Sequence, residues 1–331
     1  MTNLYEIDDS RMPLRLGSAL RVPSYAYSKW GINGNEEYLR KLSEEAYRAE
    51  WADGSPRQMQ YVSAAMQNSG YGDFPQILRK ANARAVSRLV KKFPGKVVIA
   101  DVGAGESTVT IFDRLEDEDK DRIHLTLIEP SVERIEAAAA KLEMRGFSDF
   151  DLVVGSDLGT LQQLPAIPQI ISYVATLHHH AYLDEPAQAL YRTLQTGGFL
   201  TVADWHNPMW EHPNRVYEFL QTLQWKTKEE DLEAFAEKFP LVKRKADHIG
   251  DPYQRKAMRL IQDFWRGWAA VRREAVERGE FDSRDEIFML EGHRPFVSEQ
   301  ETMSNAGFSI AEEHRLLKDS ELLMLGVYQK I

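Results

Sequence analysis

Asp101, Gly103 and Gly105 stand together where a run of mainly β-branched residues, 97–102, gives way to a helical pattern. Such a run predicts a buried parallel strand. Glycines directly after it let the backbone turn tightly and let a ligand approach the main-chain amides. The helix that follows presents N–H groups without intrahelical partners. We therefore expect a nucleotide-like cofactor to bind at this turn.

The residues missing from this turn narrow the choice of cofactor. A dinucleotide-binding turn needs a third glycine three positions after the second, and position 108 is Thr. The lysine of phosphate-binding P-loops is also absent. An acid beside a phosphate would be repelled, so Asp101 favours a cofactor that has no phosphate. The alternative is an ordinary strand-to-helix turn that binds nothing.

The stretch from Asp101 to Ser107 resembles the first motif of the class I S-adenosylmethionine-dependent methyltransferases. The resemblance covers about residues 96–204 and resumes near 298. It implies that the turn wraps the methionine end of the cofactor, that Asp101 accepts from its ammonium group, usually through water, and that Glu129 holds both ribose hydroxyls. The implied cofactor-binding residues are Asp101, Gly103, Gly105, Glu129, Asp157, Leu158 and Ala175, with Asp157 and Leu158 beside the adenine.

Histidines stand where the acceptor of a methyl group would bind. Three in succession, 178–180, follow the predicted fourth strand, and Asp204 and His206 lie at the end of the fifth. Methyl transfer is an in-line displacement, so an enzyme has to position the acceptor and, where needed, remove its proton. The candidate catalytic residues are His178, His179 and His206. Alternatively, residues 177–179 are the structural start of a helix, as is common in the family.

A metal site is a third interpretation of the same histidines. Together with His293, which comes just before the last predicted helix, His178 and His179 could bind a divalent iron or zinc ion and leave positions open. This set resembles the methyltransferases that methylate the carbon next to a 2-oxo acid, in which a metal holds the oxo acid and stabilises its enolate. Arg294 could then pair with a substrate carboxylate.

The elements that must position these residues form a Rossmann-like α/β fold. We predict a doubly wound, seven-stranded sheet with an antiparallel last strand, N-terminal helices and a helical lid insert. The predicted strands lie within residues 97–102, 123–128, 151–158, 170–175, 199–203, 308–312 and 322–328. Ser298 and Glu301 form a capping box, which predicts that the last helix begins at Ser298.

Four segments are expected along the chain. Residues 1–74 form an N-terminal helical cap, 75–207 the S-adenosylmethionine-binding core, 208–297 a helical insert, and 298–331 the C-terminal part of the core. Because the insert follows the fifth strand, we expect it above the carboxyl ends of the strands, where open α/β sheets bind ligands. It is therefore either a substrate lid or a dimerisation surface.

Composition limits the classes of partner. The net charge is −10, and no stretch gathers lysine and arginine with interleaved aromatics, which argues against a nucleic acid substrate. The absence of cysteine excludes thiolate metal sites and cysteine nucleophiles. We find neither a signal peptide nor a membrane-spanning run and expect a cytoplasmic protein with no membrane partner.

The sequence thus predicts an enzyme that transfers a methyl group from S-adenosylmethionine to a small molecule bound under the insert. One alternative is a metal-assisted C-methyltransferase of a 2-oxo acid. The other is a cofactor-binding protein without catalysis, in which the insert serves assembly, for example as a homodimer.

Overall fold

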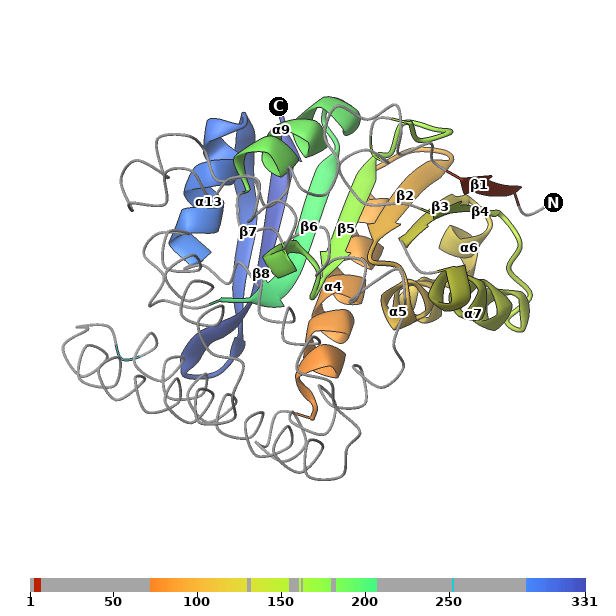
Figure 1. The fold of residues 1–331 in the computed structure, drawn as a ribbon, viewed down its shortest axis with the longest axis horizontal. Coiled ribbons are helices and arrows are strands. Elements are labelled where there is room, and N and C mark those ends of the chain that lie inside the picture. The colour runs from red at the N-terminus through yellow and green to blue at the C-terminus, as the bar shows by residue number, and fades with distance from the viewer. Residues whose placement is uncertain are drawn as a thin grey trace, which may run out of the picture.

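A mixed β-sheet crosses the molecule from β1 at one edge to β7 at the other (Figure 1). The structure is a computed structural model, and it describes residues 3–6, 72–129, 132–154, 161, 163–179, 183–206, 252 and 296–331. The strands are β1 (Asn3–Glu6), β2 (Val97–Val102), β3 (Ile123–Glu129), β4 (Phe150–Val154), β5 (Ile170–Val174), β6 (Phe199–Trp205), β7 (Phe308–Leu317) and β8 (Ser320–Lys330).

The strand order is β1-β4-β3-β2-β5-β6-β8-β7. All neighbours from β1 to β6 are parallel, whereas β8 is antiparallel to both β6 and β7. The predicted doubly wound sheet with an antiparallel last strand is therefore confirmed. Its parallel strands are buried over nearly their whole length, as expected for a sheet covered on both faces.

Strand β1 adds an eighth strand to the seven that the sequence predicts. It pairs with the edge of β4, from Asn3 opposite Asp151 to Glu6 opposite Val154. The helices predicted for the N-terminal segment lie further along the chain, so this strand is an addition to the prediction. A run of four residues is too short to show a period of two, and the unpaired edge of β4 decides its conformation.

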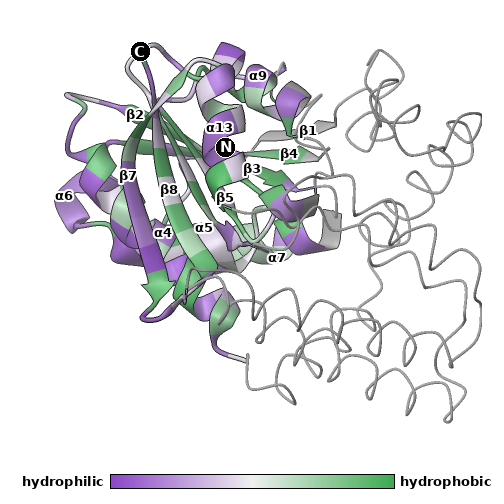
Figure 2. Ribbon diagram, turned by 90° about the vertical axis from the view of Figure 1, so that its left-hand side faces the viewer, coloured by the Kyte–Doolittle hydropathy of each residue, from purple (hydrophilic) through white to green (hydrophobic). Residues whose placement is uncertain are grey.

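Helices cover both faces of the sheet (Figures 1 and 2). On one face α4 (Phe74–Val90), α5 (Glu106–Arg114) and α7 (Val132–Glu143) pack against residues such as Ile99 and Leu125. On the other, α9 (Asp184–Thr193) and α13 (Phe296–Asn305) pack against residues such as Ile171 and Val202. Burying each of these aliphatic side chains stabilises the fold by roughly 1.5–3 kcal/mol. Two short elements complete the set, namely helix α6 (Asp117–Lys120) and the 3₁₀ turn η4 (Leu177–His179).

Helix α13 begins two residues earlier than predicted. Its first residue, Phe296, is buried, and its ring packs edge-on against His206 with centroids 5.0 Å apart. Ser298 is thus the third residue of the helix, so the prediction that Ser298 caps it is wrong. Packing of Phe296 on the core extends the helix beyond the local capping signal.

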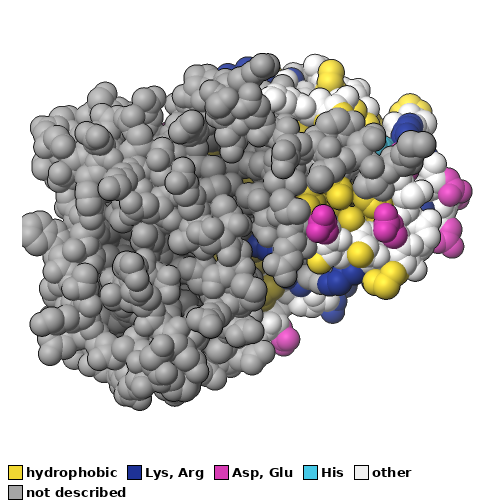
Figure 3. Space-filling model, turned by 45° about the vertical axis from the view of Figure 1, so that its right-hand side comes forward, with side chains coloured by type: hydrophobic (Ala, Val, Ile, Leu, Met, Phe, Trp, Pro, Cys, Tyr) yellow, Lys and Arg dark blue, Asp and Glu magenta, His cyan; other side chains and the backbone are white. Residues whose placement is uncertain are grey.

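The surface seen in Figure 3 is mixed in character. Acidic and basic side chains are interspersed with hydrophobic ones over its described part, which is usual for a solvated face. None of the helices that the structure describes has the length and hydrophobicity needed to span a membrane.

Several predicted features lie outside the described residues. They are the helical insert except for residues 252, 296 and 297, most of the N-terminal segment, and the candidate site residues Asp157, Leu158, His293 and Arg294.

Candidate cofactor and acceptor site

The glycine turn joins β2 to α5 at the carboxyl edge of the sheet. Gly103 has a φ of +72°, and a Cβ at this position would collide with Oγ1 of Thr176, so only glycine fits. The N–H groups of Gly103 and Ala104 both donate to the carbonyl of Ile128 at 2.9 Å, which ties the turn to β3. Gly105 then directly precedes α5. The turn is therefore fixed between the ends of β3 and β5.

Asp101 lies beneath this turn and is 1% exposed. Its Oδ2 accepts from the hydroxyls of Ser107 at 2.7 Å and Thr108 at 2.5 Å, and its Oδ1 accepts from Ser172 at 2.7 Å. Burial raises the pKa of Asp101, and the three hydroxyl hydrogen bonds oppose that rise. Thr108, which stands where a dinucleotide-binding turn has glycine, therefore holds the acid under the turn. The carboxylate predicted to reach the cofactor is turned toward protein hydroxyls.

The network continues into α4. Asn82, which is fully buried, donates from Nδ2 to Oγ of Ser172 at 2.9 Å. The chain Asn82–Ser172–Asp101 links α4, β5 and β2 behind the turn. Asn82, Ser172 and Thr108, which take part in this network around Asp101, were not predicted as site residues from the sequence.

Glu129 ends β3 next to the turn and is fully buried. Its Oε1 lies 3.9 Å from Nη1 of Arg134, which belongs to the first turn of α7. Glu129 directly follows Ile128, whose carbonyl accepts from the turn, so this predicted cofactor-binding acid lies beside the glycine turn.

Ala175 follows β5 and has a positive φ of +51°, which is uncommon for a residue with a side chain. Its N–H donates to Ala203 at 2.9 Å, and the next residue, Thr176, contacts the glycine turn as described above. Strained backbone of this kind costs roughly 1–3 kcal/mol and is concentrated at functional sites. The structure thus brings Ala175, predicted to bind the cofactor, next to the turn.

His178 and Asp204 form a closely bonded pair at the ends of β5 and β6. The His178 N–H donates to Oδ2 of Asp204 at 2.9 Å, and Nδ1 lies 2.6 Å from Oδ1. Oδ1 also accepts from the Trp205 N–H at 2.8 Å. Burial acts to raise the pKa of Asp204, but the charge and hydrogen bond of His178, the charge of His206 and the Trp205 N–H together hold it well below its usual range.

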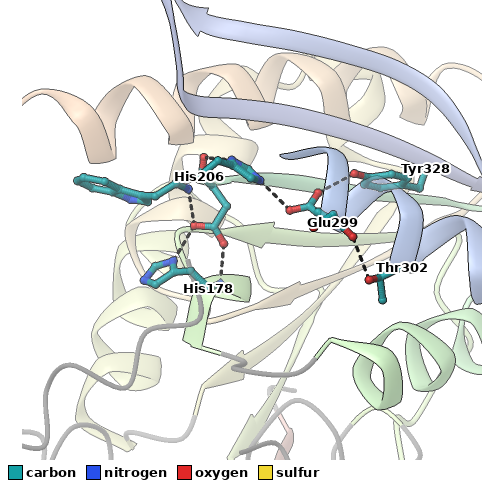
Figure 4. A network of polar contacts seen from close by, with 8 residues as sticks. His178, His206, Glu299, Thr302 and Tyr328 are labelled. Atoms are coloured by element: carbon teal, nitrogen blue, oxygen red, sulfur yellow. Dashed lines mark hydrogen bonds and ion pairs between the residues drawn. The ribbon is translucent and has the colours of Figure 1, made fainter. Parts of the chain in front are cut away.

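His206 lies between Asp204 and Glu299 and is 1% exposed (Figure 4). Nδ1 is 3.2 Å from the carbonyl oxygen of Asp204, and Nε2 is 2.9 Å from Oε2 of Glu299. The other oxygen of Glu299 accepts from the hydroxyl of Tyr328 at 2.6 Å. Burial, followed by the charge of Glu299, raises the pKa of Tyr328 well above its ordinary value, so Tyr328 stays a donor. Both ring nitrogens of His206 therefore face protein groups.

Glu299 was missed from the sequence, although a signal for it exists. Phe296, Glu299 and Met303 are all buried, and their spacing of three and four residues puts them on one face of α13. An acid on the apolar face of a helix indicates a buried polar partner.

The candidate metal ligands are only partly described. Among the described residues, no group of three His, Asp or Glu side chains could hold a metal ion. Nδ1 of His178 contacts Asp204. The side chain of His179 and all of His293 lie outside the described residues, so the predicted set of three stays a prediction.

No protein-family model matches the chain, and no curated protein matches it. Among solved structures it is similar to the CurJ carbon methyltransferase, with 12% identity and a TM-score of 0.45. The match covers 76% of this chain and 54% of that chain, which is about half of the solved CurJ chain. It is also similar to geranyl diphosphate C-methyltransferase from Streptomyces coelicolor A3(2), solved with Mg²⁺, geranyl diphosphate and S-adenosyl-L-homocysteine, with 10% identity and a TM-score of 0.43 over 76% and 79%.

A third similar structure is the cyclopropane synthase MmaA2 from Mycobacterium tuberculosis, with 10% identity and a TM-score of 0.39 over 70% of this chain and 62% of that chain. Similarity at this level concerns the fold alone, so the function of this chain is inferred from its own side chains. The strand order and the antiparallel β8 by themselves give the chain a Rossmann-like α/β fold.

Proposed function

We propose that the protein transfers a methyl group from S-adenosylmethionine to a small-molecule acceptor, with His178 as the base that takes the acceptor's proton. The observation that carries the proposal is the His178–Asp204 pair, which lies at the carboxyl ends of β5 and β6. Thr176, two residues before His178, touches the glycine turn. A proton acceptor and a cofactor-type turn therefore share one edge of the sheet, where open α/β sheets bind ligands.

The residues around the turn fit the expected cofactor. At Gly105, directly before α5, the place of a Cβ has no heavy atom nearer than Nη2 of Arg134 at 3.7 Å, and the buried Glu129 stands beside the turn for the ribose hydroxyls. S-adenosylmethionine, when bound, supplies an electrophilic methyl group on a sulfonium. Asp157 and Leu158 are proposed for the adenine, and the insert 208–297 is proposed as the cover of the acceptor.

Asp204 prepares His178 for proton transfer. A carboxylate only accepts hydrogen bonds, so Nδ1 of His178 carries a proton, and the proposal assigns to Nε2 the proton taken from the acceptor. Because Asp204 also accepts from the His178 N–H, it fixes the backbone and the ring together. The ionised Asp204 then stabilises the imidazolium that forms when His178 accepts a proton. His206, with both nitrogens on protein groups, is proposed as a support of Asp204.

The test combines cofactor binding with turnover. Calorimetric titration of the purified chain with S-adenosylhomocysteine is expected to show one site per chain. Turnover, followed as S-adenosylhomocysteine release over a panel of hydroxyl, amine and acidic-carbon acceptors, identifies the acceptor class. In His178→Asn we expect turnover to fall by about 10²–10⁴-fold with unchanged cofactor affinity, because general base catalysis contributes that much.

A matched control is His314→Asn. His314 lies on the edge strand β7, is about half exposed and pairs only at the surface with Glu312, so its replacement should leave turnover unchanged. Failure of wild-type protein to bind the cofactor would reject the function. Intact turnover in His178→Asn, with binding preserved, would reject the base and leave methyl transfer by positioning alone.

A further inference from the structure

A buried chain of polar side chains continues from the proposed base into α13 and β8 (Figure 4). His206 directly follows β6, Glu299 lies on α13 and Tyr328 lies on β8. Each of these three residues is no more than 2% exposed. Because water is excluded from them, their protein partners decide which of them carry charge.

Both ring nitrogens of His206 face oxygens that accept hydrogen bonds. Nδ1 lies 3.2 Å from the main-chain carbonyl oxygen of Asp204, and Nε2 lies 2.9 Å from Oε2 of Glu299. A neutral imidazole has one N–H and one acceptor nitrogen, whereas an imidazolium donates from both. With an ionised Glu299, only the imidazolium satisfies the two contacts at once.

The surroundings of Glu299 favour its ionised form. Its Oε1 accepts from the hydroxyl of Tyr328 at 2.6 Å, while Oε2 faces His206. Burial, followed by the charge of Glu299, raises the pKa of Tyr328, so this hydroxyl stays a donor. Hydrogen bonds donated to a carboxylate favour its charged form, and a buried charge needs a charged partner. The imidazolium of His206 is that partner.

The charge of His206 acts on Asp204, the residue that orients the proposed base. Burial by itself would raise the pKa of Asp204, whereas His178 and, more weakly, the charge of His206 lower it. The ring of His206 also holds the main chain of Asp204 through Nδ1, and its own orientation is fixed by the edge-on ring of Phe296. Asp204 in turn contacts His178 through both carboxylate oxygens.

We propose that Glu299 and His206 are positioning residues for the proposed base: the imidazolium of His206 keeps Asp204 ionised, and the ionised Asp204 keeps a proton on Nδ1 of His178. The role in turnover rests on the function proposed above, whereas the charge on His206 is a property of the chain alone. Because the pair acts through Asp204 and not on the acceptor, its loss should lower kcat and leave binding unchanged.

Nitrogen NMR spectra of the full chain, labelled with ¹⁵N at histidine, detect the charge on His206 directly. A ring with two N–H groups gives two similar nitrogen shifts, whereas a neutral ring gives two widely separated ones. The signals that disappear in His206→Gln identify the ring. At neutral pH we expect a doubly protonated His206 in wild type and a neutral one in Glu299→Gln, because an amide supplies no charge. Glu301→Gln, exposed on the same helix, is the control and should leave these signals unchanged.

Turnover of the same variants, with the acceptor class that the panel identifies, tests the role in catalysis. Glu299→Gln should lower kcat by about 10- to 100-fold, the usual worth of a hydrogen bond to a charged group. KM and cofactor affinity should stay within about twofold of wild type, and Glu301→Gln should match wild type throughout. If Glu299→Gln does not fold, the double variant Glu299→Gln/His206→Gln leaves no lone charge buried, and its kcat should fall by the same factor.

Other outcomes overturn the proposal in distinguishable ways. A neutral His206 in the wild-type spectrum would overturn it whatever the kinetics. A charged ring in Glu299→Gln would remove Glu299 from the pair. Unchanged kcat in folded Glu299→Gln or in the double variant would show that the pair serves the fold alone. A wild-type chain that neither binds cofactor nor turns over any acceptor would reject the proposed function and the role in catalysis, while the spectrum would still decide the charge on His206.

Discussion

Asp204 uses both carboxylate oxygens to hold its neighbours. One accepts from the His178 N–H, and the other contacts the His178 ring and accepts from the Trp205 N–H. Asp204 is 1% exposed, so water cannot readily replace these partners. A buried donor left without an acceptor costs roughly 1–3 kcal/mol. The contacts that orient the proposed base therefore also stabilise the fold.

Replacing Asp204 by Asn should lower the free energy of unfolding by roughly 3–5 kcal/mol at neutral pH, because it takes a buried carboxylate away from the His178 N–H, the His178 ring and the Trp205 N–H. The pKa of Asp204 is lower in the folded chain than in the unfolded one. Its stabilising contribution is therefore complete above the unfolded value of about 3.9 and is lost as the pH falls through the folded value. The difference in stability between wild type and variant should accordingly narrow below about pH 4.

Denaturant unfolding of both proteins over a pH series measures this difference. Other acids titrate in both proteins and cancel in the comparison. A difference that widened on acidification would show that Asp204 is not held in its ionised form.

At the scale of the element, α13 shows how packing overrides a local signal. Ser298 and Glu301 have the spacing of a capping box, but the helix begins at Phe296, which packs against His206. Glu301, the second residue of the expected box, is exposed. The acid that matters is Glu299, which is 2% exposed and contacts both His206 and Tyr328. The helix therefore acts as a support for the end of β6.

Three alanine variants on α13 test whether the start of the helix is stabilised by a cap at Ser298 or by buried contacts such as those of Glu299. Ser298→Ala should change the unfolding free energy by less than about 0.5 kcal/mol, since a residue inside the helix caps nothing, whereas loss of a true cap costs about 1 kcal/mol. Glu299→Ala should cost roughly 3–5 kcal/mol, because it leaves a buried histidine without its charged partner. Glu301→Ala is the exposed acidic control and should stay within about 0.5 kcal/mol of wild type. Chemical denaturation measures all three, and a full capping loss in Ser298→Ala would contradict the start of the helix at Phe296.

At the scale of the whole molecule, the sequence predicted the features whose signals are local. Each core strand is a hydrophobic run bounded by turn residues. Asp101 is the last residue but one of β2, and Glu129 is the last residue of β3. Because both strands are parallel, the predicted fold already places the two acids at the same edge of the sheet. The side-chain contacts between residues far apart in the sequence could not be predicted. His206 and Glu299 are 93 residues apart, and Asn82 and Ser172 are 90 apart. Pairings of this kind depend on which helix faces which strand. Strand β1 was missed for another reason, because four residues are too few to show the alternation of a strand.

Two acids at neighbouring strand ends, Asp101 and Glu129, should therefore respond differently to substitution. Asp101 accepts from three buried hydroxyls, so Asp101→Ala should lower the unfolding free energy without ligand by roughly 3 kcal/mol or more. Glu129 is proposed to bind the cofactor ribose, so Glu129→Gln should reduce the increase in unfolding free energy that bound ligand produces. A ligand that binds only the folded state adds about 2.7 kcal/mol at a hundredfold excess over its Kd.

Unfolding curves with and without S-adenosylhomocysteine distinguish the two roles. Wild type should gain that stability on addition of ligand, and Glu129→Gln should lose the gain, because an amide replaces the carboxylate that would accept from both ribose hydroxyls. Arg88→Gln, which removes an arginine paired at the surface with Glu312 of β7, should keep the full gain. If Glu129→Gln were stabilised by ligand as much as wild type, the ribose would bind elsewhere. If Asp101→Ala kept its stability without ligand, the hydroxyl network would not be what holds the glycine turn in place.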